Sequence, residues 1–321
     1  MKTSRVMLAG AAVTLCIACS SSSDDSGPAA PAYPVDLAVP EYGMQVQTVG
    51  RMIPSGADEE WCEVVELPGD PSETYFIGRT EIAMAPFSHH LIISIAPEGA
   101  ERLEQSALGS PIPCDGAHQF GAGLVTLAAS AKTHTVADVP PGIGYVVHGG
   151  QRLLFDYHAL NTSSAPVPAA HRLNLHRVDH IDKPARLFGF YNQYIEIPPH
   201  SSRSFADQCT FTGDVLVWSL LRHTHRRGTD FQVWWSGGEH DAEHIWTSTD
   251  WEQDISFGFD EPVLMPAGTG FRWQCAFDNP TDETLIFGPQ ATDEMCILFG
   301  RFAAAGDDAS VTPQSCYRFA P

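Results

Sequence analysis

Short runs of β-branched and aromatic residues, separated by turn-forming residues, dominate the pattern of apolar and polar positions. The clearest predicted strands are residues 88–96, 151–159, 215–221, 230–235 and 284–288. Each is bounded by Gly, Pro, Asn or Asp, which favour turns over strands. No stretch keeps a 3.6-residue apolar period over four turns, so no long helix is predicted. Short strands between frequent turns predict an all-β fold of sandwiches or barrels.

The chain length predicts two domains, because 321 residues exceed one ordinary sandwich. The segment Ile-Asp-Lys-Pro-Ala at 181–185 is a plausible junction between them. It predicts an N-terminal domain over 35–184 and a C-terminal domain over 185–321.

The N-terminus predicts export. Residues 1–19 combine two basic residues with a short apolar stretch that ends at Cys19, as in a bacterial lipoprotein signal peptide. An ordinary secretory signal with an incidental cysteine is the alternative, and it also predicts export. Residues 20–34, rich in Ser, Asp, Pro and Ala, predict a flexible tether. We therefore expect a periplasmic or cell-surface protein of a bacterium. Lipid on Cys19 would be its only attachment to the membrane, which we expect to be the outer membrane.

The charge balance excludes some partners. The chain has 18 basic and 39 acidic residues, a formal net charge of −21. This balance argues against nucleic acid and against electrostatic binding to an anionic membrane.

The cysteines predict disulfide bonds in an exported chain. Of eight cysteines, one is removed with the signal peptide and one is the lipidation site. An even number remains, as expected for disulfides. Spacing alone leaves the pairing open among Cys62, Cys114, Cys209, Cys275, Cys296 and Cys316.

Histidines in three segments give the sharpest chemical signal. His223 and His225 follow an apolar strand, and strand residues i and i+2 share a face, so both rings can reach one ion. His89 and His90 are adjacent, so they can share an ion only at a strand end or a bulge. His158 ends another predicted strand. Taken alone, His223 and His225 are equally compatible with two surface histidines, the adjacent pair is weak evidence, and a histidine such as His158 is more often structural.

Met295, in Thr-Asp-Glu-Met-Cys at 292–296, adds a soft donor. Methionine ordinarily fills a core, but a thioether beside imidazoles suits copper, particularly Cu(I). The sequence contains neither HExxH nor a Cys/His tetrad of the kind that binds zinc. The acidic loop at 278–282 is a weaker candidate for calcium.

The order of these segments resembles the copper type II, ascorbate-dependent monooxygenases, the family of peptidylglycine α-hydroxylating monooxygenase and dopamine β-monooxygenase. The resemblance covers about 62–316. Its most specific parts are LRHTHRRG at 221–228 and ATDEMC at 291–296, with support from SHHLI at 88–92 and YHALN at 157–161.

The resemblance implies two tandem jelly-roll-like antiparallel β-sandwich domains that bind two copper ions per chain. By position, the electron-transfer copper would be held by His89, His90 and His158, and the catalytic copper by His223, His225 and Met295. Three protein ligands leave a position open for O2. The implied reaction uses O2 and ascorbate or a similar reductant to hydroxylate a C–H bond, and the second oxygen atom leaves as water.

The resemblance also implies disulfide pairs. It pairs Cys209 with Cys316 and Cys275 with Cys296, and it leaves Cys62 and Cys114 to pair with each other.

Several positions differ from the peptide-amidating members. Leu221, Ile297 and Phe299 stand where those members carry polar anchors for the peptide, so we expect a neutral, less polar substrate. Asp156 lies two residues before His158 on the same predicted face, and we expect it to orient a ligand or perturb its neighbours.

Three functions are compatible with the sequence. The first is a copper monooxygenase, an enzyme that hydroxylates an unknown small molecule or peptide. The second is a non-catalytic, copper-handling lipoprotein on the same fold. The third is a structural or adhesive exported sandwich with incidental histidines.

Overall fold

The computed structural model describes residues 34–95, 103, 105–114, 124–251, 255–288, 290, 292–306 and 317–318. The predicted signal peptide with Cys19, nearly all of the tether, and Cys316 lie outside these residues. The described residues all belong to one compact unit, Pro34–Pro321, and all that follows concerns this unit. In the described part, no helix is long and apolar enough to cross a membrane.

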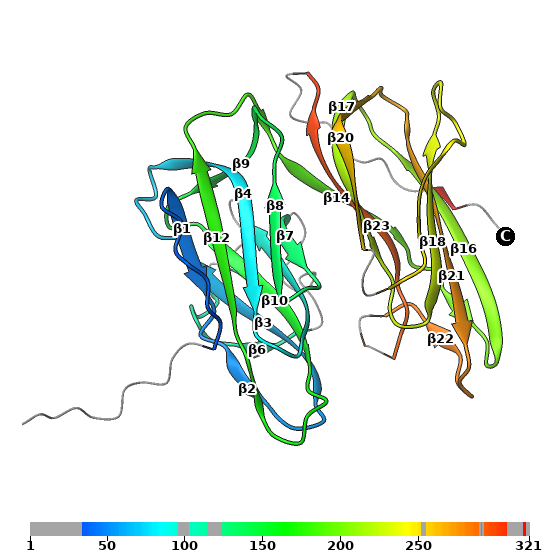
Figure 1. The fold of residues 1–321 in the computed structure, drawn as a ribbon, viewed down its shortest axis with the longest axis horizontal. Coiled ribbons are helices and arrows are strands. Elements are labelled where there is room, and N and C mark those ends of the chain that lie inside the picture. The colour runs from blue at the N-terminus through cyan, green and yellow to red at the C-terminus, as the bar shows by residue number, and fades with distance from the viewer. Residues whose placement is uncertain are drawn as a thin grey trace, which may run out of the picture. The chain divides into compact units, whose positions relative to one another are not determined.

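The fold is all-β, as the sequence predicts, and its strands pair in two separate sets that form two mainly antiparallel sandwiches (Figure 1). The predicted strands correspond to β5 (Ser88–Ile95), β10 (Arg152–Leu160), β17 (Val215–His223), β18 (Gly228–Ser236) and the shorter β22 (Leu285–Ile286). Strands up to β13 pair only with one another, and so do strands from β14 onward.

The first sandwich, coloured blue to green in Figure 1, has two main layers. Its six-stranded sheet contains β1 (Gly43–Gln47), β12 (His171–Val178), β4 (Thr74–Met84), β9 (Ile143–His148) and β13 (Lys183–Pro184) in that order, with β8 (His134–Asp138) paired to β4. Its five-stranded sheet contains β6 (Ile112–Pro113), β3 (Asp58–Glu66), β10 (Arg152–Leu160), β5 (Ser88–Ile95) and β7 (Val125–Ser130). The short strands β2 (Arg51–Ile53) and β11 (Val167–Ala169) pair separately.

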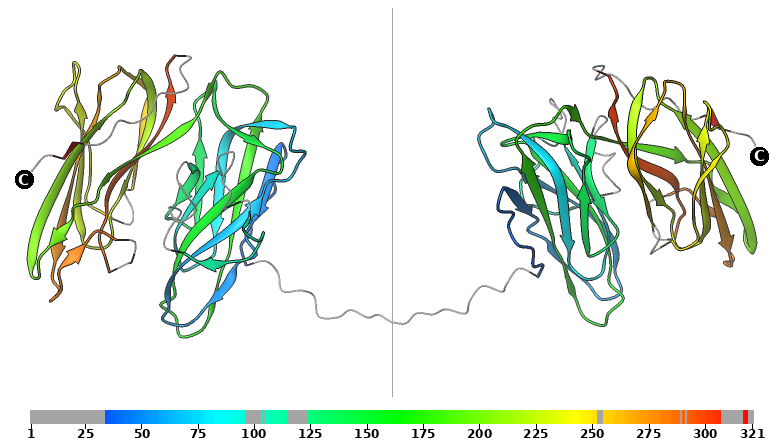
Figure 2. Two further views of the ribbon diagram at one scale, coloured as in Figure 1. Left: turned by 180° about the vertical axis from the view of Figure 1, so that it is seen from behind. Right: turned by 45° about the horizontal axis from the view of Figure 1, so that its top comes forward.

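The second sandwich repeats the two-layer plan, which Figure 2 shows from two further directions. Its four-stranded sheet contains β14 (Arg186–Asn192), β23 (Cys296–Ala304), β17 (Val215–His223) and β20 (Ser256–Met265). Its five-stranded sheet contains β19 (His244–Ser248), β18 (Gly228–Ser236), β21 (Gly270–Asn279), β16 (Ser201–Thr210) and β24 (Tyr317–Arg318). The short strands β15 (Glu196–Ile197) and β22 (Leu285–Ile286) pair beside them.

Strand alternation divides the side chains of β10 between the two faces of its sheet. On β10, Leu153, Phe155 and Tyr157 enter the core of the first sandwich, whereas Leu154 belongs to a smaller cluster on the opposite face. Because successive side chains point to opposite faces, Asp156 and His158 lie with Leu154, outside that core. The alternation of side chains along β10 thus places the polar Asp156 and His158 on the face opposite the core.

Disulfides join strands in both sandwiches. Cys62 pairs with Cys114, and Cys275 pairs with Cys296, as expected. Cys209 is also disulfide-bonded, but its expected partner Cys316 lies outside the described residues. The Cys275–Cys296 bond ties β21 in one layer of the second sandwich to the first residue of β23 in the other.

Side chains of the second sandwich pack on the first within the compact unit. Trp218 on β17 and Ala303 on β23 are buried in the core cluster that otherwise belongs to the first sandwich. The side chain of Arg301 bonds to both Tyr145 of the first sandwich and Ser219 of the second. These contacts bring the histidine-bearing strands of the two sandwiches close together.

Candidate metal centre

A bulge places His89, His90 and His158 together. Along the antiparallel pair of β5 and β10, His158 lies opposite His90, but the next residue, Ala159, lies opposite Ser88. The register therefore skips His89, which is the extra residue of a β-bulge. This is the irregularity that the adjacent histidines require in order to share one ion.

The nitrogen atoms of these three rings converge. One nitrogen of each ring lies within 4.8 Å of the others. Nδ1 of His89 is 3.3 Å from Nδ1 of His90, and the ring centroids of His90 and His158 are 5.2 Å apart. The predicted first ligand set is thus geometrically able to hold one metal ion.

Asp58, at the start of β3, bonds to Nε2 of His158. A carboxylate accepts a hydrogen bond from Nε2, and a neutral imidazole has one donor nitrogen and one acceptor. The lone pair of His158 therefore lies on Nδ1, where it can bind a metal ion that His89 and His90 share. Carboxylates commonly orient metal-binding histidines in this way. Sequence reasoning missed Asp58 and assigned such a role to Asp156, which contacts the sulfur of Cys114 at 3.7 Å. No local signal identifies Asp58, because 100 residues separate it from His158.

His223 and His225 stand at the end of β17, where the chain turns into β18. The backbone N–H of Gly228 donates to the carbonyl of His225 at 3.0 Å and closes this turn. The two imidazole centroids are 5.3 Å apart. Nδ1 of His225 donates to the carbonyl of Asp293 at 2.9 Å, so the lone pair of Nε2 remains for a metal.

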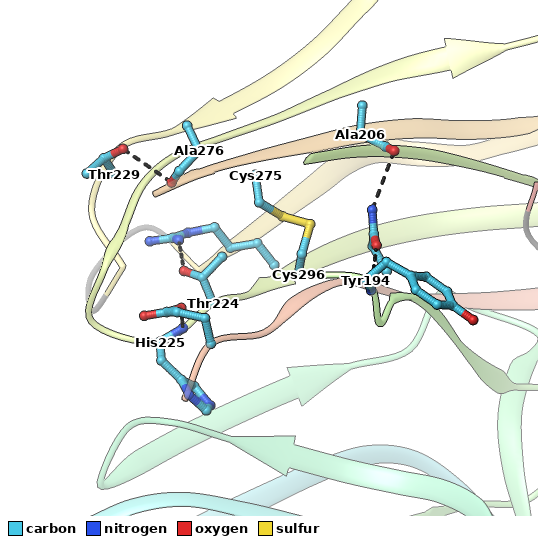
Figure 3. Close-up of a disulfide and its surroundings, with 11 residues drawn as sticks. Tyr194, Ala206, Thr224, His225, Thr229, Cys275, Ala276 and Cys296 are labelled. Carbon is cyan, nitrogen blue, oxygen red and sulfur yellow. Dashed lines mark hydrogen bonds between the residues drawn. A yellow bond between two sulfur atoms is a disulfide. The ribbon is translucent and has the colours of Figure 1, made fainter. Parts of the chain in front are cut away.

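Met295 immediately precedes β23, and His223 lies opposite Ile297 in the pairing of β17 with β23. The backbone at Met295 is therefore beside the turn that carries His225. The Glu294 carboxylate accepts hydrogen bonds from the backbone N–H of both His225 and Met295. In Figure 3 the ring of His225 points away from the Cys275–Cys296 disulfide.

The two histidine groups lie close to each other. The ring centroid of His90, from the first sandwich, is 6.0 Å from that of His223, from the second. Trp251 of the second sandwich stacks on His89 with centroids 6.0 Å apart. Five histidines from three separated parts of the sequence thus form one cluster.

Desolvation favours the neutral form of four of these imidazoles, of which His225 is buried and His89, His90 and His223 are half-buried. Desolvation, followed by the neighbouring His158 and His225, lowers the pKa of His89 to about 4. Desolvation is also the main reason why the pKa values of His90 and His223 lie well below the ordinary value, and why the pKa of His225 is lowered. Metal binding needs the neutral ring, so the cluster suits a soft or borderline ion.

Apolar and aromatic side chains adjoin the second histidine pair. Leu221 lies opposite Phe299 in the sheet, and the ring of Phe299 is 6.4 Å from that of His223. Tyr191 packs edge-on against Phe299 with centroids 5.7 Å apart. Gly189 permits this arrangement, because a Cβ there would lie 2.8 Å from the Tyr191 ring and 2.9 Å from the Phe299 ring.

A second group of possible donors does not fit a metal. Cys62, Cys114 and Asp156 converge and are buried, but the two cysteines are joined in a disulfide. Thiolate is the metal-binding form of cysteine, so this group has no sulfur ligand to offer.

Comparison with known proteins identifies no functional relative. No family model matches the chain, and no curated protein matches it. Among solved structures, the major capsid protein P2 of bacteriophage PM2 is similar over 83% of this chain and 99% of its own, with 10% identity and a TM-score of 0.36. VP2 of infectious bursal disease virus covers 90% of this chain and 80% of its own, with 11% identity and a TM-score of 0.20.

Glycoside hydrolases are also among these structures. A β-porphyranase of glycoside hydrolase family 86 from Bacteroides plebeius covers 82% of this chain and 39% of its own, with 9% identity and a TM-score of 0.17. Likenesses this weak carry no information on function.

Proposed function

We propose that the protein is a copper-dependent monooxygenase that hydroxylates a C–H bond of a small molecule or peptide with O2 and a reductant such as ascorbate. The convergence of five histidines, together with Met295 on the adjoining backbone, carries this proposal. The donor types suit copper in both oxidation states, since imidazole binds either and a thioether favours Cu(I).

Each residue has a distinct role in this proposal. His89, His90 and His158 would hold one copper, and Asp58 would keep Nδ1 of His158 directed at it. His223, His225 and Met295 would hold the other, and the bond from Nδ1 of His225 to the Asp293 carbonyl would direct Nε2 at it. When bound, the two ions would supply one-electron redox chemistry and a site at which O2 is activated.

The surroundings of the second set support a substrate of low polarity. Leu221, Phe299 and Tyr191 present apolar surface beside His223. Such a surface would position an apolar C–H group and keep bulk water from the reaction.

Metal content and oxygen uptake test this proposal together. The purified protein, loaded with copper, is expected to hold two ions per chain and to consume O2 when ascorbate and a suitable substrate from a screen of apolar compounds are added. Met295→Ala should keep the first copper and lose substrate-dependent uptake. Met265→Ala, which alters a buried core methionine, serves as the control for loss of a methionine.

The outcomes separate the candidate functions. Two coppers with no uptake across the screen would favour a copper-handling lipoprotein. A protein that binds no copper stoichiometrically would contradict both, and would favour a structural or adhesive role for the fold.

A further inference from the structure

Glu294 has a buried carboxylate, and it is not one of the residues proposed to bind copper. Its exposed fraction is 0%, and it lies between β22 and β23. A carboxylate buried without partners is strongly unfavourable, so the groups that surround it indicate what it does.

Its two oxygen atoms accept hydrogen bonds from the turn between β17 and β18. Oε2 accepts from the backbone N–H of His225 at 3.0 Å, and Oε1 accepts from the backbone N–H of Arg227 at 2.8 Å. The backbone N–H of Met295 bonds to the same carboxylate. One side chain therefore holds the backbone of the histidine turn and the backbone of the methionine segment.

The segment that carries Glu294 is itself fixed. The backbone N–H of Glu294 donates to the carbonyl of Ile286 at 3.0 Å, and its carbonyl accepts from Gly288 at 3.3 Å. The preceding residue, Asp293, accepts the Nδ1 hydrogen of the His225 ring. Consecutive residues thus hold both the backbone and the ring of His225.

A disulfide strengthens the same connection on the other side of Met295. Cys296 forms a disulfide bond with Cys275 on β21. Met295 therefore lies between Cys296, which is held covalently, and Glu294, which is held by hydrogen bonds. The carboxyl group of Glu294 offers two oxygen atoms to the backbone N–H groups of His225, Arg227 and Met295, which suits it to this role.

We propose that Glu294 is a positioning residue that fixes His225 and Met295 relative to each other as one ligand set for copper. This rests on the proposed function, since the ligand set matters only if copper binds there. Glu294 does not itself bind the metal. It acts by holding two backbone segments whose side chains do.

The test uses Glu294→Gln in the full chain, because an amide keeps the size but has only one acceptor oxygen for the two N–H groups of the turn. Glu283→Gln, an exposed glutamate in the same sandwich, is the matched control. Copper affinity, sulfur scattering in the X-ray absorption spectrum of the Cu(I) protein, and amide hydrogen exchange at His225 and Arg227 are measured for each.

We expect Glu294→Gln to weaken the second copper by about 10–100-fold, to lose the sulfur contribution and to speed exchange at both amides. The first copper should be retained, which also reports that the variant folds. Glu294→Asp, which keeps the charge but shortens the side chain, should show the same loss.

Unchanged affinity, sulfur scattering and exchange in Glu294→Gln would overturn the inference. Parent protein that binds copper at the first set but never shows sulfur scattering would overturn the assigned second ligand set instead. The metal-free exchange data would then still show whether Glu294 holds the turn.

Discussion

The histidines of the first and second sandwich are held in place by different means. His90 and His158 face each other across paired strands, and His89 joins them through a bulge in the same ladder. His223 and His225 instead occupy a strand end and a turn, which depend on Glu294, Asp293 and a disulfide nearby. The hydrogen-bond ladder between β5 and β10 continues along both strands, whereas the turn between β17 and β18 is held by a few specific hydrogen bonds. We therefore expect the second set to be the more sensitive to changes outside its ligands.

Removal of a ligand has the largest expected effect and tests whether the two sets act separately. His90→Ala should lower copper affinity at the first set by more than about 100-fold and leave the second ion bound, and His223→Ala should do the reverse. Equilibrium titration with a copper chelator measures both. Loss of both ions from either variant would show that the cluster is one shared site, which the 6.0 Å between the rings of His90 and His223 makes a real alternative.

Gly228→Ala tests the sensitivity of the turn without removal of any ligand. A Cβ at this position would lie 2.4 Å from Oγ1 of Thr224, the residue between the two histidines, so the turn must shift. We expect a loss of about 1–3 kcal/mol in the free energy of unfolding and weaker binding of the second copper only. Gly258→Ala, where a Cβ would have no atom within 4 Å, is the control. Equal effects of the two variants in denaturant titrations would contradict this account.

Asp58→Asn makes the corresponding test on the first set. An asparagine keeps the shape but offers a weaker acceptor to Nε2 of His158, so the ring loses orientation. Copper affinity at the first set should fall by about 10–100-fold, with the second set unaffected. Asp138→Asn removes an exposed ion pair with Arg79 in the other sheet of this sandwich and should change neither. An affinity loss at the second set would mean that the two sets are coupled more tightly than their strands indicate.

The smallest expected effect is the pH dependence of the metal-free protein. His89 has a pKa of about 4 in the folded protein, and the pKa of His90 is also lowered. In the unfolded chain both histidines have the ordinary pKa of about 6.5, so below this pH the unfolded chain binds more protons than the folded one. Their contribution to stability is complete above about pH 6.5 and is lost as the pH falls toward about 4. His90→Asn should therefore make the unfolding midpoint less sensitive to pH between about 7 and 5. Parallel curves for parent and variant would show that His90 titrates normally in the fold.

Local pattern was enough to predict the clearest strands and the all-β fold, because β-branched runs and turn residues act over a few positions. It also predicted that the adjacent histidines could share an ion only at a bulge or a strand end, and the pairing of His158 with His90 and of Ala159 with Ser88 is a bulge. Spacing could not choose among the disulfide pairings, because Cys62 and Cys114 meet only through tertiary folding across 52 residues.

The residues that orient the ligands were harder to predict for the same reason. Asp58 reaches His158 across 100 residues, and Glu294 reaches the backbone of His225 across 69. Glu294 was visible as part of the motif around Met295, but nothing in the sequence indicates that its carboxylate turns toward the histidine turn. Contacts of this kind depend on strand register and sheet packing, which a single sequence constrains weakly.

Anomalous diffraction at the copper absorption edge, from crystals of the copper-loaded protein, tests the central claim most directly. The account predicts two peaks, one among His89, His90 and His158 and one beside His223, His225 and Met295. Copper found only at other surface histidines, with no peak in this cluster, would contradict it.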